Sequence, residues 1–384
     1  MGDSLRRRGN AATSLVGRGQ RVSSASLARR PAPERGSEAT GTKRAEPAQY
    51  RGAVTHRPGL DPAVAQTRRA VRAALAGMPA GATVVVALSG GADSLALAAA
   101  TAFEAPKAGL TAVSVTIDHG LQAGSTDAAA AAAAQARALG IEPRIVRVRV
   151  GSDGGPEAAA RAARYAALRD EASVLRATAV LTGHTLDDQA ETVLLGLARG
   201  SGAASLQGMA PVSQLADGIA LLRPLLGLHR ATTRAACAAE ELVPWDDPQN
   251  EDASFARVRV RSRVLPVLEA ELGPGIAEAL ARTAEQLRED AEAFDEMIDE
   301  TIEDIVEHAE AGISVSVPAL AANPPALRHR IIRHVVAAEF GASLTRVQTL
   351  EVARLVTDWN GQGPIDLPAC RARRTGARLE FTAH

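Results

Sequence analysis

The sequence predicts an α/β protein in which a doubly wound parallel sheet is followed by a smaller, mainly helical domain. Between residues 83 and 182, short apolar runs alternate with alanine-rich helical stretches, a pattern typical of a parallel sheet covered by helices. Beyond residue 266 the alternation stops and helical periodicity dominates. Hydrophobic residues make up 46% of the 384 positions, which is enough to build substantial cores.

Residues 61–265 are expected to form the sheet domain. An amphipathic helix is predicted over residues 65–72, and a β-branched run at residues 83–88 predicts a strand buried on both faces. Ligands bind such sheets at the carboxyl ends of the strands, so polar motifs that follow strands are candidate site residues. Further strands are expected at residues 111–117, 144–150 and 179–182, separated by helices at residues 94–103, 127–139 and 157–176.

Residues 266–384 are expected to form the second, mainly helical domain. Residues 285–310 contain twelve acidic residues and one arginine, and their apolar residues recur at helical spacing. This pattern predicts a helix with an apolar stripe and a solvated acidic face. A turn at residues 361–364 is followed by two short strand candidates, around residues 365–367 and 378–381.

Residues 1–60 are expected to form a disordered basic tail. Up to residue 51 the chain has eleven Arg or Lys against four Asp or Glu, and few large apolar residues. Such a segment cannot bury enough surface to offset its ordering entropy. The tail is either a weak electrostatic arm for RNA or a solvated extension.

Composition also excludes several classes of protein. We find no apolar stretch long enough for a membrane span and no export signal, so we expect a cytoplasmic protein without a membrane partner. The only cysteines, Cys237 and Cys370, form no Cys-x-x-Cys pair. A zinc site, an iron–sulfur cluster and a redox disulfide are therefore not expected.

A glycine-rich turn directly after the first strand predicts a phosphate-binding loop. Its backbone N–H groups, and those of the helix that follows, can converge on a phosphate. The chain has only two lysines, neither in a Walker context, and the third glycine of a dinucleotide fingerprint is missing. A carboxylate beside phosphates requires a cation between them, so we assign Asp93 to Mg²⁺. The loop consists of Ser89, Gly90, Gly91, Ala92, Asp93 and Ser94.

Two further motifs carry charged groups toward the same edge of the sheet. Asp118 and His119 end the second predicted strand, where they could face a nucleotide. Arg161 and Arg164 are three residues apart, on one face of a predicted helix. They are either a fork for phosphate oxygens or ordinary solvent-facing arginines.

The segment of residues 183–192 follows a strand and opens a helix, which Thr185 or Asp187 could cap. Carboxylates at a helix start are commonly only dipole partners. A histidine followed by three acids beside a phosphate loop also suits metal binding and substrate positioning, with Asp188 as a second metal ligand. The candidates are His184, Asp187, Asp188 and Glu191, and Arg199 adds a cation before a glycine loop.

The loop at residues 89–94 resembles the signature of N-type ATP pyrophosphatases, the PP-loop proteins. Together with the motifs at residues 118–121, 157–165, 183–192 and 198–202, it resembles the tRNA(Ile)-lysidine synthetase family. Residues 245–250 and 259–266 look like later motifs of this family, and the resemblance covers residues 65–384. Two departures, Trp245 before Asp246 and Val258 after Arg257, bear on the RNA contacts there. A carboxy-terminal module of longer relatives is expected to be missing or reduced.

The resemblance implies an adenine nucleotide α-hydrolase-like fold and a two-step reaction with ATP and Mg²⁺. The wobble cytidine in the anticodon loop of a minor tRNA(Ile) would attack the α-phosphorus of ATP, and the amino group of free L-lysine would then replace AMP at C2. Residues 266–384 would bind tRNA. The oligomeric state stays open, a homodimer being one option. Expected RNA contacts are Arg199, Arg257, Arg259, Arg261, Arg263, Arg328, Arg330 and Arg333.

Three alternatives stay open. The alternation of arginine and valine at residues 257–260 could be an exposed strand with salt-bridged arginines. A tRNA thiolase would also adenylate a base, but its usual sulfur chemistry calls for paired cysteines. A non-catalytic adenine-nucleotide sensor would keep the phosphate loop without needing metal-binding carboxylates.

Overall fold

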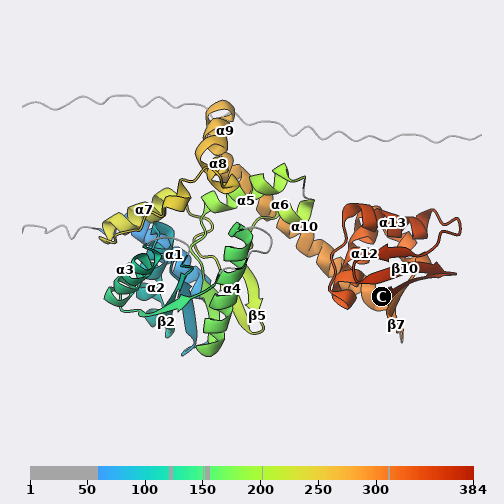
Figure 1. The fold of residues 1–384 in the computed structure, drawn as a ribbon, viewed down its shortest axis with the longest axis horizontal. Coiled ribbons are helices and arrows are strands. Elements are labelled where there is room, and N and C mark those ends of the chain that lie inside the picture. Colours follow the sequence, from blue (N-terminus) through green and yellow to red (C-terminus); the bar gives the residue numbers. More distant parts are fainter. Residues whose placement is uncertain (1–58, 121–123, 150, 152–155, 201, 310–311) are drawn as a thin grey trace, which may run out of the picture. The chain divides into compact units, whose positions relative to one another are not determined.

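The computed structural model describes residues 59–120, 124–149, 151, 156–200, 202–309 and 312–384 (Figure 1). The predicted basic tail, except for its last two residues, lies outside the described residues. All of the described residues belong to one compact unit, which runs from Pro58 to His384.

The first part of this unit is built on a six-stranded sheet with the order β3-β2-β1-β4-β6-β5. The pairs from β3 to β6 are parallel, whereas β5 pairs antiparallel with β6 at the edge. The predicted doubly wound sheet is confirmed, and the β5–β6 hairpin is an addition to it. The strands are β1 (Thr83–Ala87), β2 (Thr111–Asp118), β3 (Glu142–Arg147), β4 (Ala177–Leu181), β5 (Val212–Ala216) and β6 (Ile219–Leu222).

Helices cover both faces of this sheet (Figure 1). Side chains alternate along β1, so Val84 and Val86 join one core with residues of the first two helices, while Val85 joins a second core with Leu168 and Ala172. The helices are α1 (Pro62–Leu75), α2 (Ala92–Glu104), α3 (Ser125–Ala138), α4 (Pro156–Val174), α5 (Leu186–Ala198), α6 (Ala203–Leu206) and α7 (Arg230–Ala239), with short 3₁₀ turns η1 (Pro106–Ala108) and η2 (Pro248–Asn250).

The arginine-rich segment is helical. It forms α8 (Ala256–Arg259), a π-helical turn η3 (Val260–Val264) and α9 (Leu265–Leu272), so the alternative of an exposed strand is wrong. Helical geometry places residues four apart on the same face. Arg257 and Arg261 can therefore reach a common partner, whereas in an extended strand they would share a face but lie about 13 Å apart.

A long helix, α10 (Ile276–Ile305), packs against α5. Its fully buried residues recur every seventh position, at Ala284, Ala291, Ile298 and Ile305. This spacing is that of one helical face and confirms the predicted apolar stripe. Among the described helices, none combines the length and the apolar composition that a bilayer span requires.

Residues after α10 combine helices with a second sheet around their own core. The sheet is antiparallel, with the order β7-β8-β11-β10-β9. The sequence predicted β9 and β11 but not β7, β8 or β10, and β7 begins at Val306, within the segment expected to continue the acidic helix. β10 alternates buried Cys370 and Ala372 with arginines. The elements are β7 (Val306–Ala309), β8 (Gly312–Ser316), α11 (Val317–Ala322), α12 (Pro325–Phe340), α13 (Arg346–Thr357), β9 (Ile365–Leu367), β10 (Cys370–Thr375) and β11 (Arg378–Ala383).

Candidate active site

The predicted phosphate loop joins β1 to α2. Gly90 takes a positive φ of 88°, which favours glycine. The hydroxyl of Ser94 accepts the N–H of Ser89 at 3.1 Å and donates to the carbonyl of Gly91 at 2.9 Å, so the turn is closed by its own side chain. Within the described chain, Gly91 caps α2 without a side-chain hydrogen bond. The first N–H groups of α2 are thus left for a ligand.

The segment of residues 183–192 lies directly against this loop. A Cβ built on Gly183 would stand 2.9 Å from the carbonyl carbon and oxygen of Asp93 and 3.1 Å from the nitrogen of Ser94. Real Cβ atoms do not approach backbone so closely, so a glycine is required here. The two motifs that the sequence singled out therefore share one site.

Replacing Gly183 by alanine is expected to push the phosphate loop out of register and to weaken ATP binding by about tenfold or more. The physical reason is that the colliding atoms are backbone, which cannot rotate away as a side chain can. Isothermal titration with a non-hydrolysable ATP analogue measures the effect. Gly227→Ala serves as the control, because a Cβ at Gly227 meets nothing within 4 Å. Equal affinities for the two variants would contradict the tight contact.

Thr185 caps α5 in a reciprocal arrangement with Asp188. The Asp188 carboxylate accepts the N–H and the hydroxyl of Thr185 at 2.9 and 2.8 Å, and its other oxygen lies 2.9 Å from Nη2 of Arg230. Burial alone would raise the pKa of Asp188, but Arg230 and the Thr185 hydrogen bonds lower it overall. Asp188 therefore carries a negative charge in the site at neutral pH. Asp187 is less buried than Asp188, and its carboxylate accepts the backbone N–H of Arg230 at 2.8 Å.

Arg230, the first residue of α7, was missed by the sequence analysis. Its Nε lies 3.6 Å from Asp93, and its Nη2 lies 3.3 Å from Glu191 in addition to the contact with Asp188. One face of α7 continues this contact: the Thr233 hydroxyl hydrogen-bonds the Asp93 carboxylate, and the Cys237 thiol donates to the Ala92 carbonyl at 3.2 Å. The spacing of Arg230, Thr233 and Cys237 is helical, but nothing in it indicates the phosphate loop as the partner.

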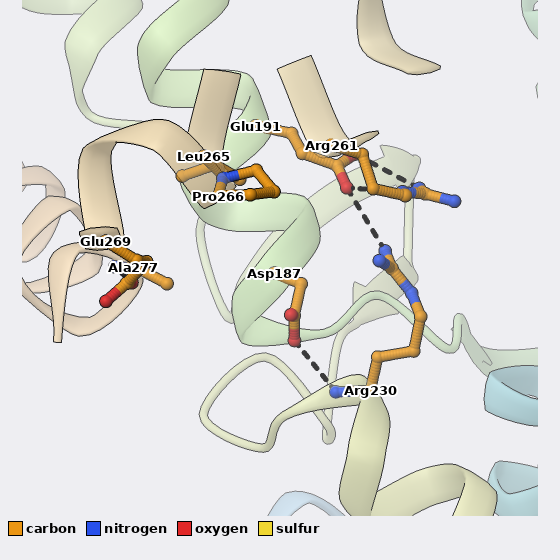
Figure 2. A pocket seen from close by; sticks show the side chains of 8 residues that line it. All are labelled: Asp187, Glu191, Arg230, Arg261, Leu265, Pro266, Glu269 and Ala277. Carbon is orange, nitrogen blue, oxygen red and sulfur yellow. Dashed lines mark hydrogen bonds and ion pairs between the residues drawn. The ribbon is translucent and has the colours of Figure 1, made fainter. Parts of the chain in front are cut away.

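Glu191 is fully buried and is surrounded by arginines. Nε of Arg261 lies 2.7 Å from its carboxylate, Arg230 lies at 3.3 Å, and Arg257 at 3.7 Å. Figure 2 shows Arg230 and Arg261 converging on this carboxylate. Arg257 and Arg261, which the sequence assigned to RNA contacts, both lie on the helical face directed toward Glu191 and remain partly exposed.

A cavity of about 220 Å³ opens beside these charges (Figure 2). Three acids and two arginines line it, which gives a formal balance of one negative charge. Its apolar wall faces the charged groups from α9 and the start of α10. The lining residues are Asp187, Glu191, Arg230, Arg261, Leu265, Pro266, Glu269 and Ala277.

Asp93 and Asp188 have the chemistry of a Mg²⁺ site. Burial and the nearby charge of Asp188 raise the pKa of Asp93, against the effect of Thr233 and Arg230, so its carboxylate gains from a further cation. No group of three or more His, Cys, Asp or Glu in the described chain could hold a metal by itself. Mg²⁺ commonly binds one or two carboxylates and completes its shell with water and substrate phosphates, which fits this pair beside a phosphate loop.

Asp118 holds the loop after β2 rather than facing an open site. Its carboxylate accepts the Gly120 N–H at 3.0 Å and the Ser125 and Thr126 hydroxyls at 2.8 and 2.9 Å, and lies 3.5 Å from Arg147. The expected direct contact with a nucleotide thus has strong internal competitors. Nδ1 of His119 is buried and has no hydrogen-bond partner among the described residues. Leu121, the last residue of this motif, lies outside them.

Cationic side chains surround His184. The guanidinium of Arg161 lies 4.9 Å from the ring centre of Tyr165, and both Arg161 and Arg164 are exposed. Burial is the main cause that lowers the pKa of His184 to about 4. The charge of Asp188 acts in the opposite direction, and the charges of Arg223, Arg161 and Arg257 lower the pKa further. His184 is therefore neutral at pH 7, and its Nδ1 lies 3.0 Å from the Thr182 hydroxyl.

This histidine predicts a pH dependence of stability. The unfolded chain binds the proton below about pH 6.5, whereas folded His184 binds it only near pH 4. The free energy of unfolding is therefore unaffected by protonation of this group above about pH 6.5, and it decreases as the pH falls from 6.5 toward 4. At pH 5 the loss is about 2 kcal/mol, and His184→Gln should lack it. Urea denaturation at pH 7 and pH 5 measures this; an equal loss in both proteins would contradict the prediction.

Family models and relatives show the family to which the chain belongs. Residues 65–268 match the model described as a PP-loop domain, and residues 316–380 match the TilS substrate binding domain. A tRNA(Ile)-lysidine synthase of Leifsonia xyli is 61% identical over 306 residues, which are 79% of this chain and 91% of the relative. The chain belongs to the tRNA(Ile)-lysidine synthase family. Two further members, from Thermobifida fusca and Salinispora tropica, are 50% and 52% identical and are each covered over 96% of their length.

Solved structures support the fold of this tRNA(Ile)-lysidine synthase family member. A U34-tRNA thiolase from Methanococcus maripaludis matches with a TM-score of 0.51 and 21% identity, over 59% of this chain and 80% of the thiolase. At this identity the likeness concerns the fold alone. Cys237 and Cys370 are both buried, and they belong to different cores.

The remaining arginines expected to bind RNA in this family member lie in different environments. Arg199, Arg263 and Arg333 are exposed, as is Arg259, whose guanidinium donates to the carbonyls of Ala253 and Ser254. Arg328 donates to three carbonyls at the end of α11, and Arg330 stacks 4.4 Å from the ring centre of Phe294. The exposed group keeps the better access to phosphates. Ser201, beside Arg199, lies outside the described residues.

Proposed function

We propose that this chain joins free L-lysine to C2 of the wobble cytidine of a minor tRNA(Ile) by way of an adenylated base. In the first step the C2 carbonyl oxygen attacks the α-phosphorus of ATP, and the bond to pyrophosphate breaks. In the second step the lysine amino group attacks C2, the C2–O bond breaks and AMP leaves, while the amine gives up a proton. The contact between the phosphate loop and the residue 183–192 segment carries this proposal.

The phosphate loop would bind ATP for the first step. Backbone N–H groups at the start of α2 can bind the phosphates of ATP and stabilise charge that develops on pyrophosphate. Asp93 and Asp188 would hold Mg²⁺ at the loop. When bound, the metal would neutralise phosphate charge in the transition state. His184, which is neutral at pH 7, can accept or donate one hydrogen bond without adding charge.

The cavity beside Glu191 would bind the second substrate, lysine. Its balance of one negative charge matches free lysine, which carries two ammonium groups and one carboxylate. Its 220 Å³ is below the size usual for nucleotide or drug-sized pockets, and Leu265, Pro266 and Ala277 can contact an aliphatic chain. Asp187 can bind an ammonium group and Arg230 or Arg261 the carboxylate, while the buried Glu191 contributes negative charge behind them. Asp187 is the more exposed acid and the candidate to help the amine lose its proton.

The anticodon loop would reach this site as single-stranded RNA, from which a cytidine can be unstacked. The exposed Arg199 caps the end of α5, which carries Glu191, and the exposed Arg259 and Arg263 lie on α8 and η3, which carry its partners Arg257 and Arg261. Arg333 lies on α12 within the segment that matches the substrate-binding model. Arg161 and Arg164 would serve the ATP or RNA phosphates near His184. A substrate of this kind places the enzyme in the cytoplasm.

Lysine-dependent formation of AMP tests the proposal. The chain should release pyrophosphate with tRNA and ATP, should form AMP only when lysine is added, and should shift the mass of the anticodon-loop nucleoside by the addition of lysine less one water. Sulfur incorporation would favour a thiolase, and nucleotide binding without turnover would favour a sensor. The buried, separated cysteines argue against the thiolase, and the paired carboxylates argue against the sensor.

A further inference from the structure

The guanidinium of Arg230 contacts carboxylates from both halves of the site. Nε lies 3.6 Å from Asp93 and Nη2 lies 2.9 Å from Asp188, the two acids assigned to the metal at the phosphate loop. Nη2 also lies 3.3 Å from Glu191, which lines the cavity proposed for lysine. Its side chain is 17% exposed and that of Glu191 is 0% exposed, so solvent screens these ion pairs weakly. A single arginine thus reduces the electrostatic repulsion among the three carboxylates of Asp93, Asp188 and Glu191.

The backbone of Arg230 is anchored independently of its side chain. Its N–H donates to Asp187 at 2.8 Å, its carbonyl accepts from Thr233 at 2.8 Å, and Cys237 ties the same face of α7 to Ala92. The guanidinium stands at the end of a flexible stem. It can therefore leave one carboxylate for another without any movement of α7.

A divalent cation would require the position that the guanidinium holds. Asp93 and Asp188 are close enough for the charge of Asp188 to act on Asp93, and Arg230 lies between them. Magnesium needs short, nearly octahedral contacts with oxygen, which a guanidinium bridging the same two carboxylates obstructs. Glu191, deeper in the site, can keep Arg230 after Asp93 has released it.

We propose that Arg230 is a positioning residue that stands in for the divalent cation: it holds Asp93 and Asp188 in place before ATP binds, and gives up Asp93 when the cation arrives. The role of the cation rests on the proposed function. The exchange keeps the site folded while it is empty of substrate. When the metal binds at Asp93, the guanidinium of Arg230 moves toward Glu191.

The test is the response of an Arg230→Gln variant to metal in the absence of ATP, tRNA and lysine. With a chelator present, the variant should melt at least about 4 °C below the wild type, because charged groups are left unpaired. Millimolar Mg²⁺ should restore more than half of this loss. Electron paramagnetic resonance should show Mn²⁺ binding about tenfold more tightly to the variant than to the wild type.

Arg72→Gln is the matched control, because Arg72 makes two hydrogen bonds, of 2.9 and 2.7 Å, with buried Glu104 elsewhere in the same domain. It should lose stability that Mg²⁺ does not restore. If Mg²⁺ stabilises Arg230→Gln no more than Arg72→Gln, and Mn²⁺ affinity stays at the wild-type value, the proposal is overturned.

Arg230→Lys covers the case in which the glutamine variant does not fold. A lysine ammonium is a compact charge that cannot bridge three carboxylates, so Mn²⁺ should again bind more tightly than to the wild type, and unchanged affinity would overturn the proposal. None of these measurements involves turnover. If the wild-type enzyme formed no AMP in response to lysine, the proposed function would be refuted. The role of Arg230 would still be decided by the Mn²⁺ affinities and melting temperatures of the variants.

Discussion

Replacing Asp93 by asparagine is expected to lower tRNA-dependent pyrophosphate release by about a thousandfold or more, because several kcal/mol of transition-state stabilisation are lost with the metal. The fold should survive. Burial raises the pKa of Asp93, which means that the native state disfavours its charge, and a neutral isostere relieves that cost while still accepting a hydrogen bond from Thr233. We therefore expect a melting temperature equal to or above that of the wild type.

Pyrophosphate release and thermal melts of the same preparation measure both effects. Asp127→Asn is the control, because Asp127 is an exposed acid in the first turn of α3, as Asp93 is an acid in the first turn of α2. It removes a comparable interaction with a helix dipole and should leave turnover unchanged. Normal turnover of Asp93→Asn would remove Asp93 from the metal site, and a collapse of its melting temperature would make its role structural.

Replacing Glu191 by glutamine should give the largest loss of stability. Its carboxylate is fully buried against Arg230, Arg257 and Arg261, and removing one partner of a buried ion pair costs about 3–5 kcal/mol. For a domain of this size the melting temperature should fall by about 10 °C. The proposed function adds that the KM for lysine should rise by about tenfold or more, since the formal charge of the cavity lining falls from one negative charge to zero.

The control for this variant is Glu171→Gln. Glu171 pairs with Arg144 at 3.2 Å on the surface, where both side chains are partly exposed, and such pairs contribute at most about 1 kcal/mol. Calorimetry of both variants and lysine titrations of AMP formation provide the measurements. If Glu191→Gln were no less stable than Glu171→Gln, the arginine cluster would not hold the site together.

Local patterns carried much of the correct prediction. The β-branched run before the phosphate loop, the Thr185 cap and the apolar stripe of α10 each depend on residues within a few positions of one another, so their periodicity is visible in the chain. Short or mixed strands were harder to predict. The β5–β6 hairpin turns at Asp217-Gly218, and β10 pairs with the predicted β11 across a turn at Gly376-Ala377. These strands were missed although the turn signals are local, because none of them is a continuous β-branched run.

The sequence by itself determined the phosphate loop, the acidic segment after β4 and the family to which they belong, because each is a contiguous run whose chemistry does not depend on distant partners. Only the tertiary structure decided which cations meet those acids. Arg230 is 42 residues from Asp188, Arg261 is 70 from Glu191, and Thr233 is 140 from Asp93. An arginine that faces RNA and one that neutralises a buried carboxylate look the same in a sequence. They differ only in the surface against which the folded chain places them.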